Sequence, residues 1–382
     1  MNKGGLAFFG LRKWPETKEL PRRIYSYDLL RGLCAIFVAL YHFLFWTANT
    51  TSYVSPLGAI NNAGTYGVYM FFMLSGATMC SSYRDRLKTS ADFVYYYGVR
   101  WARILPLYFF VMMLTVLSLY FIVGEKDWSL AKIILNSSLL FGFGMPGETS
   151  NVGGGWSIGI EVVFYTVFPM LLFLMDTKSW KFDLVLLLTA CFVQITFVNY
   201  VVAINGADFH LAWDYYTNFL SFAGYFVFGC MVSKWLLPRR QVSSGFAILI
   251  VFILTLGFVF YPTSGSGESV SGYSGFVFLI IAFAVFLLWS MCELPVWLRG
   301  VGSFLGDISY SVYLLHPFCF KGVELVTSRL IDPEFLARQP WVVIIVSMIL
   351  TIIAAKIVYV VVEKPMLAYF KTRLKKQLVA AG

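Results

Sequence analysis

The sequence predicts an all-α membrane protein: a polytopic helix bundle with about ten transmembrane helices and both termini in the cytoplasm. Of the 382 residues, 59% are hydrophobic and only 13% are charged, whereas soluble domains are typically about half apolar and about a quarter charged. Mostly apolar stretches long enough to cross a bilayer recur along the whole chain. Continuous runs of this kind are typical of spanning helices, because barrel strands alternate apolar and polar residues.

Ten apolar segments are predicted to span the membrane. Their ranges are roughly 28–47, 64–82, 103–123, 157–175, 183–203, 215–236, 244–262, 273–291, 304–327 and 341–363. A weaker apolar stretch, 130–143, is too short to span, and we expect it to lie on the membrane surface or to enter the membrane and return. The spans form one transmembrane domain, 28–365, between a basic N-terminal segment, 1–27, and a basic tail, 366–382, both cytoplasmic.

The distribution of Lys and Arg predicts the orientation. With the N-terminus in the cytoplasm, the inside segments hold 22 of the 29 Lys and Arg residues and the outside segments hold four, as the positive-inside rule requires. The net charge of +9 therefore follows from topology and indicates no nucleic-acid partner. The six cysteines form no CxxC pair, so neither a metal site nor a disulfide framework is predicted. The basic N-terminal segment lacks the features of a cleaved signal peptide.

Few ionisable side chains lie within the predicted spans, where they are costly and usually functional. Arg31 and His42 lie on the first span, Glu161 on the fourth and His316 on the ninth. At a rise of about 1.5 Å per residue, His42 and Glu161 share a similar depth below the outer face. The two side chains are therefore expected to meet if their helices are neighbours.

Arginines gather toward the predicted cytoplasmic side, where Arg100 and Arg103 at the start of the third span lie level with Arg31. The planar guanidinium suits phosphate, and histidine suits general-base chemistry, with a carboxylate to orient the imidazole. Structural roles remain open for each group. Boundary arginines also anchor helices on the inside, and tryptophans near span ends also form interface belts.

Six motifs follow one another along the chain. They are YDLLRGLCAIFVALYH with Arg31 and His42, GVYMFFMLSG with Ser75, RWARILPLY with Arg100 and Arg103, GWSIGIEVVFYTVFP with Trp156, Ser157 and Glu161, GDISYSVYLLHP with Tyr310 and His316, and Glu363-Lys364-Pro365. Together they resemble the acyltransferase-3 membrane proteins, which O-acylate polysaccharides, lipopolysaccharide and related glycans in bacteria. The resemblance extends from about Tyr27 to Pro365.

This resemblance implies a membrane O-acyltransferase that moves an acyl group, most commonly acetyl, from acyl-CoA to a hydroxyl of an extracytoplasmic polysaccharide or glycolipid. It implies that Arg31 and His42 are essential and that Arg100 and Arg103 bind the donor from the cytoplasmic side. Our hypothesis adds Arg31 to the donor-binding residues and makes His42 and Glu161 the catalytic pair, with His42 as the base and Glu161 orienting it. The partners expected are acyl-CoA, a glycan acceptor and membrane lipid, with no metal, and the expected location is the bacterial inner membrane.

The same resemblance makes five further residues candidates for substrate binding or support of the site. They are Trp156, Ser157, Ser75, Tyr310 and His316. Two positions depart from the family pattern: Val162 stands where many members carry a second acidic residue, and Ala77 replaces a common Phe. A mechanism that needs two adjacent carboxylates is therefore not expected.

Several alternatives remain open on the sequence. A transporter that moves a glycan or lipid-linked sugar without chemistry also places charges in the membrane. The donor and acceptor classes are not fixed by any residue, so a succinyl donor, a peptide or a small lipid stays possible. Transfer is either direct or by way of an acyl-histidine intermediate.

Overall fold

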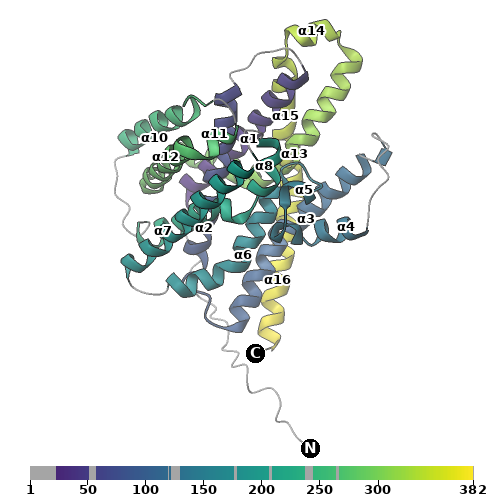
Figure 1. The fold of residues 1–382 in the computed structure, drawn as a ribbon. Coiled ribbons are helices and arrows are strands. Elements are labelled where there is room, and N and C mark those ends of the chain that lie inside the picture. The colour runs from purple at the N-terminus through teal and green to yellow at the C-terminus, as the bar shows by residue number, and fades with distance from the viewer. Residues whose placement is uncertain are drawn as a thin grey trace, which may run out of the picture.

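The structure, a computed structural model, describes residues 23–50, 57–118, 120–121, 130–175, 179–205, 209–236, 244–263 and 266–381. Residues 1–22 of the predicted N-terminal segment lie outside these ranges. Within the described residues every regular element is a helix. The all-α class predicted from the sequence is confirmed (Figure 1).

The long helices account for all ten predicted spans. They are α1 (Tyr25–Thr50), α2 (Leu57–Tyr83), α3 (Ser90–Ser118), α6 (Gly155–Met175), α7 (Trp180–Ile204), α9 (Ala223–Trp235), α10 (Ser244–Val259), α12 (Gly272–Met291), α13 (Val296–Leu330) and α15 (Trp341–Val358). The elements between and after them are α4 (Leu130–Ser137), η2 (Leu140–Phe143), α5 (Pro146–Thr149), α8 (Phe209–Tyr216), η3 (Phe219–Phe222), α11 (Ser266–Val270), α14 (Pro333–Arg338), η5 (Tyr359–Glu363) and α16 (Lys364–Ala381).

Six of these helical segments in the described chain are long and apolar enough to cross a membrane by themselves. Two more, Phe219–Trp235 and Ala247–Val259, are apolar but shorter. The remaining two, α2 and α13, are long and carry more polar residues, as helices facing the interior of a bundle do. The chain is therefore a multi-pass helical membrane protein, and the sidedness inferred from the charges remains a prediction.

Two helices extend well beyond the ranges predicted for them. The third span was expected to start at 103, but α3 begins at Ser90. Arg100 and Arg103 therefore lie within the helix and not at its start. The predicted range followed apolarity, which marks membrane contact, whereas a helix continues through polar residues wherever other helices pack on it.

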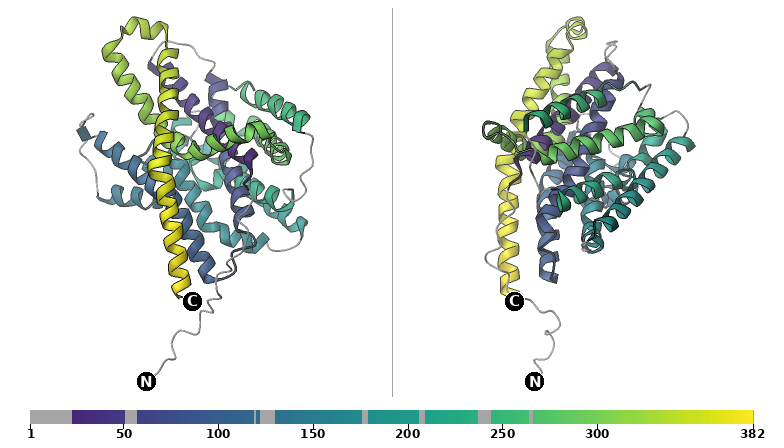
Figure 2. Two further views of the ribbon diagram at one scale, coloured as in Figure 1. Left: turned by 180° about the vertical axis from the view of Figure 1, so that it is seen from behind. Right: turned by 90° about the vertical axis from the view of Figure 1, so that its left-hand side faces the viewer.

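The segment expected as a basic tail, 366–382, is helical almost throughout. The α15 helix continues through the π-helical turn η5 into α16, and Figure 2 shows the three as one long rod. The α16 helix packs on α3, and Gly98 marks their close approach, because a Cβ there would lie 2.6 Å from the Leu374 side chain. The α14 helix lies at the opposite end of the molecule from the C-terminus (Figure 1).

The weak apolar stretch 130–143 does not span, as predicted. It folds into α4 and η2, and the chain turns between them at Leu139, which has a positive φ of 57°. The η2 turn packs directly on α6, where a Cβ on Gly142 would lie 2.1 Å from the Gly159 carbonyl oxygen. The segment thus forms a short return against the α6 surface.

Two glycines bring α1 and α13 together. A Cβ on Gly32 would lie 2.3 Å from the Leu305 Cβ, and a Cβ on Gly306 would lie 2.6 Å from the Asp28 Cβ. Small residues at such crossings allow membrane helices to approach closely. His42 lies ten residues after Gly32, and His316 lies ten residues after Gly306. The close crossing therefore carries both histidines along the same interface.

Candidate active site

The candidate site is built around two neighbouring cavities. The smaller one, the inner cavity, has a volume of about 100 Å³ and is lined by α1, α2, α3, α6 and α13. Three guanidinium groups and one carboxylate face it: Arg31, Arg100, Arg103 and Glu161. These four residues, chosen on the sequence as donor-binding and catalytic, are brought together with an excess of positive charge.

Arg100 is held between two aromatic rings. Its guanidinium carbon lies 4.9 Å from the centre of the Tyr83 ring and 5.3 Å from that of Tyr165. Its Nε is buried and has no hydrogen-bond partner in the structure. A buried donor without an acceptor is costly, so Arg100 is held in this position at the expense of one unsatisfied donor.

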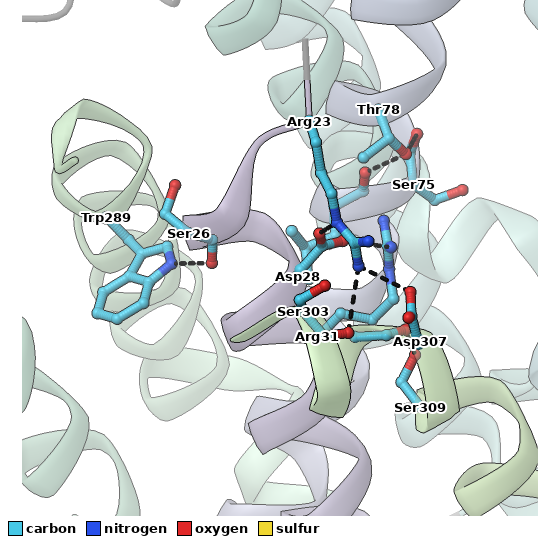
Figure 3. Close-up of polar contacts among 12 residues, drawn as sticks. Arg23, Ser26, Asp28, Arg31, Ser75, Thr78, Trp289, Ser303, Asp307 and Ser309 are labelled. Carbon is cyan, nitrogen blue, oxygen red and sulfur yellow. Dashed lines mark hydrogen bonds and ion pairs between the residues drawn. The ribbon is translucent and has the colours of Figure 1, made fainter. Parts of the chain in front are cut away.

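The other two arginines are only weakly neutralised. The Arg31 guanidinium lies 3.6 Å from the Asp28 carboxylate on the same helix. Arg103 lines the cavity, and no hydrogen bond or ion pair is found for it within the described chain. Asp28 is also held by Arg23, which bridges it to Asp307 on α13 (Figure 3). This bridge fixes the inner end of α1 on α13 and turns part of the Asp28 charge away from Arg31.

Glu161 does not orient His42, contrary to the expectation from depth alone. Its carboxylate accepts hydrogen bonds from the Ser75 hydroxyl at 3.0 Å and from the Tyr165 hydroxyl. The α1 helix packs chiefly on α13 and α2, so the residue that meets His42 comes from α13. Glu161 belongs instead to the inner cavity with the arginines.

His42 pairs with His316. The Nδ1 atom of His42 lies 3.1 Å from Nε2 of His316 and 2.9 Å from the Val38 carbonyl oxygen. The Nδ1 atom of His316 lies 2.7 Å from the Tyr313 carbonyl oxygen. The His316 ring is almost fully buried, at 1% exposure, and the Trp46 ring stacks on it at 6.0 Å.

These contacts determine which nitrogens carry protons. A carbonyl oxygen only accepts, so His316 has its proton on Nδ1 and offers the lone pair of Nε2. The Nδ1 of His42 likewise carries a proton, which it directs at Val38 and His316. The Nε2 of a neutral His42 is therefore the unprotonated nitrogen, and it is the one available as a base.

His42 lines the second and larger cavity, the outer cavity, which has a volume of about 1320 Å³. Segments before α6 and around α8, α11 and α12 contribute most of its remaining wall, and all of them belong to predicted outside loops or lie next to one. Trp156, chosen as a substrate residue, lies on this wall. The outer cavity is larger than the roughly 300–1,000 Å³ of typical small-molecule sites.

Comparison with known proteins identifies the family. A family model described as an acyltransferase domain matches residues 24–360, almost the whole described chain. The chain belongs to the acyltransferase-3 family. A protein of Acidianus two-tailed virus, named "Putative acetyltransferase ORF330", is 26% identical over 290 residues, which is 75% of this chain and 80% of that protein. No solved structure matches the chain to a significant degree.

Three of the five support candidates of this acyltransferase lie around the inner cavity. Ser75, Ser157 and Tyr310 line it, and the Tyr310 hydroxyl donates to the Ile104 carbonyl oxygen at 2.9 Å, which ties α13 to α3. The Ser75 hydroxyl donates a hydrogen bond to the Glu161 carboxylate. Trp156 stands apart from them in the outer cavity, and His316 lies behind His42.

One residue of the acyltransferase-3 motifs, Tyr313, has a larger part than the sequence suggested. It lines both cavities, as does Val68. Its hydroxyl lies 2.6 Å from the Ser157 hydroxyl and donates to the Gly154 carbonyl oxygen at 3.0 Å. Gly154 has a positive φ of 78°, which fits the glycine run before α6. Tyr313, Ser157 and Gly154 therefore form part of the partition between the cavities.

A second residue was missed altogether. Asn136 of α4 is fully buried, and it holds the segment that leads to α6. Its side chain donates to the Thr149 carbonyl oxygen at 2.9 Å and accepts from the Asn151 backbone N–H at 2.9 Å. The Tyr108 hydroxyl also donates to it. The signal available in the sequence was a lone amide within the apolar stretch 130–143. The hydrogen bonds of Asn136 show that this stretch supports the wall of the outer cavity.

Proposed function

We propose that the protein is an O-acyltransferase that carries an acyl group from acyl-CoA, bound on the inner-cavity side, to a hydroxyl of a glycan in the outer cavity. The observation that supports this most is the separation of charge: three arginines face the inner cavity, whereas the base, His42, faces the outer one. The name of the viral relative and the commonest activity of the family favour acetyl as the acyl group.

The arginines supply what an acyl-CoA needs. Its phosphates and carbonyls are acceptors for charge-assisted hydrogen bonds, and Arg forms these in pairs. Arg100 has an unused buried donor, and Arg31 and Arg103 carry charge that the protein neutralises only in part. We therefore place the coenzyme A phosphates at these arginines, on the predicted cytoplasmic side, and the thioester at the boundary of the two cavities beside Tyr313, where His42 and the acceptor hydroxyl reach it.

His42 acts as the general base. Its Nε2 takes the proton of the acceptor hydroxyl while the hydroxyl oxygen attacks the thioester carbonyl. A carbon–oxygen bond forms, the carbon–sulfur bond breaks, and the coenzyme A thiolate takes the proton back from the imidazolium. His316 keeps the Nδ1 proton of His42 in place, so the base stays in the correct tautomer.

An acyl-histidine intermediate uses the same atoms in two steps. His42 Nε2 then attacks the thioester carbonyl and displaces the coenzyme A thiolate. The acceptor hydroxyl afterwards attacks the acyl-imidazole, the carbon–nitrogen bond breaks, and the hydroxyl proton passes to the thiolate. In either version the donor remains on the cytoplasmic side and the acceptor on the outer side of a membrane, and on the family resemblance we propose that this is a bacterial inner membrane.

The test uses purified full-length protein in proteoliposomes, acetyl-CoA labelled in the acetyl group, and a glycan acceptor. We expect His42→Ala to lower label transfer by about 10²- to 10⁴-fold, the range typical of a general base. Lys321→Ala is the matched control, because this exposed lysine pairs with Glu324 on the surface of α13, away from the site. Equal transfer by wild type and His42→Ala would contradict the mechanism.

Two further outcomes separate the alternatives. Label that stays on the wild-type protein and moves to glycan on addition of acceptor indicates an acyl-histidine intermediate. Movement of glycan across the membrane without release of coenzyme A would instead make the protein a transporter.

A further inference from the structure

The outer cavity differs from the inner one most in its charge. Among the described residues that line it, Glu268 is the only one with a fixed charge, and neither Lys nor Arg is present. We propose that this cavity binds an uncharged sugar unit of the acceptor and selects against sugars that carry a carboxylate or a phosphate. The inference rests on the proposed function for what happens to the sugar, but the binding itself needs no donor.

The wall of the cavity suits the faces of sugar rings. Aromatic side chains from six parts of the chain line it: Tyr41, Phe45, Trp46, Trp156, Trp213, Tyr216, Tyr261, Tyr273 and Tyr313. The Trp156 and Trp213 rings meet at 77° with their centres 5.3 Å apart, so they form a corner. Aromatic rings with a polar edge pack well against a surface that is apolar on its face and polar at its rim, and a pyranose has that form.

An unused polar group points to the same ligand. The side-chain nitrogen of Asn151 is buried, lines this cavity with its residue, and has no hydrogen-bond partner in the structure. Buried amide donors are nearly always paired. The hydroxyl and ring oxygens of a sugar are uncharged acceptors, and a rotation of the Asn151 side chain toward the cavity would present its donor to them.

A charged sugar would lose more free energy on leaving water than this cavity could return. A carboxylate or phosphate that leaves water needs a cation or several donors as compensation, and proteins that bind such groups use Arg or Lys. The described lining offers neither Arg nor Lys. The inner cavity shows that this chain does place arginines where an anion is bound in our proposal. The acceptor is therefore expected to be neutral at the unit that is acylated.

The experiment measures sugar binding to the full-length protein in lipid nanodiscs, without any acyl-CoA, by tryptophan fluorescence. The two ligands are a neutral gluco-tetrasaccharide and its counterpart oxidised at C6 to uronates, so they differ mainly in charge. We expect the neutral ligand to bind at least tenfold more tightly at low salt. Equal or tighter binding of the uronate, or binding of neither ligand, would overturn the proposal.

Variants assign the signal to this cavity. Trp156→Phe and Asn151→Ala are expected to weaken binding of the neutral ligand severalfold, whereas Trp297→Phe is not, because that ring is 77% exposed at the start of α13. Glu268→Lys should bring uronate binding to within about threefold of neutral binding. If Glu268→Lys leaves the preference unchanged, charge is not its cause and the proposal fails.

The same protein separates this inference from the proposed function. Tetrasaccharide binding with the expected preference but without label transfer from acetyl-CoA would defeat the acyltransfer mechanism and leave the sugar site standing. Label transfer to acceptors regardless of their charge would support the acyltransfer mechanism and overturn the proposed preference for a neutral sugar.

Discussion

The two cavities stand side by side and are opposite in character. The inner cavity is small and holds three arginines and one carboxylate. The outer cavity is about 1320 Å³ in volume and is aromatic, with a single carboxylate in its described lining. Both are bounded by Tyr313 and Val68. In our proposal this difference means that one helix bundle binds an anionic donor and a neutral acceptor in separate cavities on either side of a partition.

The contrast also explains why the acid and base groups are not together. Intramembrane Glu161 sits with the arginines and accepts hydrogen bonds from Ser75 and Tyr165. His42 sits in the other cavity and relies on a second histidine. A carboxylate next to His42 would have placed a negative charge where our proposal has the acceptor, whereas a neutral imidazole fixes the tautomer without one.

The largest expected effect on this comparison comes from the inner cavity. Arg100→Ala should raise the KM for acetyl-CoA about 10- to 100-fold, since a hydrogen bond to a charged group contributes about 1.5–3 kcal/mol. The KM for the acceptor should remain unchanged. Arg100→Lys should recover only part of the loss, because it keeps the charge but not the planar fork.

The measurement is a steady-state titration of each substrate at saturating concentrations of the other. Arg373→Ala on α16, an exposed arginine bonded to Tyr369, is the control. A change in acceptor KM with donor KM unchanged would mean that the two cavities have been assigned the wrong way round.

The second expected effect concerns the histidine pair. His316→Ala should lower kcat about tenfold, less than His42→Ala, because the Val38 carbonyl still holds the Nδ1 proton of His42. His316→Gln offers an oxygen acceptor and should recover part of the rate. The pH profile of kcat, measured for each variant, should shift in His316→Ala, since the surroundings of the base have changed. Equal losses in the two alanine variants would show that His316 does more than position its neighbour.

The sequence predicted the parts of the site better than their arrangement. Charged groups inside spans stand out against an apolar background, so Arg31, His42, Glu161 and His316 could be found without coordinates. Depth along a helix also follows from residue number. Which helices are neighbours does not, so the sequence could pair His42 with Glu161 only on the condition that their helices meet, and the structure instead places His316 beside His42.

The close crossing that pairs the histidines depends on tertiary contacts. Gly32 and Gly306 are two of 31 glycines, and no local pattern distinguishes them. Helix ends were misjudged where the apolar pattern stops but packing continues, as in α3 before Arg100. The prediction that 130–143 does not span held because eight helical residues at about 1.5 Å each are too short. The hydrogen bonds by which Asn136 holds the segment before α6 could be found only from the structure.

A smaller effect is expected from Glu161. Glu161→Gln keeps the shape and the Oε1 acceptor that Ser75 and Tyr165 share, and it removes the one carboxylate among the described residues that line the inner cavity. We expect a change of a few-fold in the KM for acetyl-CoA and no shift in the pH profile of kcat. A shifted pH profile would couple Glu161 to the base and would favour the arrangement expected from the sequence alone.

The smallest expected effect tests the partition itself. Tyr313→Phe keeps the ring and removes the hydroxyl that joins Ser157 and the Gly154 carbonyl, a loss of about 1 kcal/mol per hydrogen bond. The partition should then open more often and admit water from the outer cavity to the thioester. Hydrolysis of acetyl-CoA without acceptor should rise about three- to fivefold, measured as free thiol. Tyr66→Phe is the matched control, because it loses a buried hydroxyl bonded to Thr255 and lines neither cavity. A rise in both variants would trace hydrolysis to general loosening, and a rise in neither would show that other side chains, such as Val68, keep the two cavities apart.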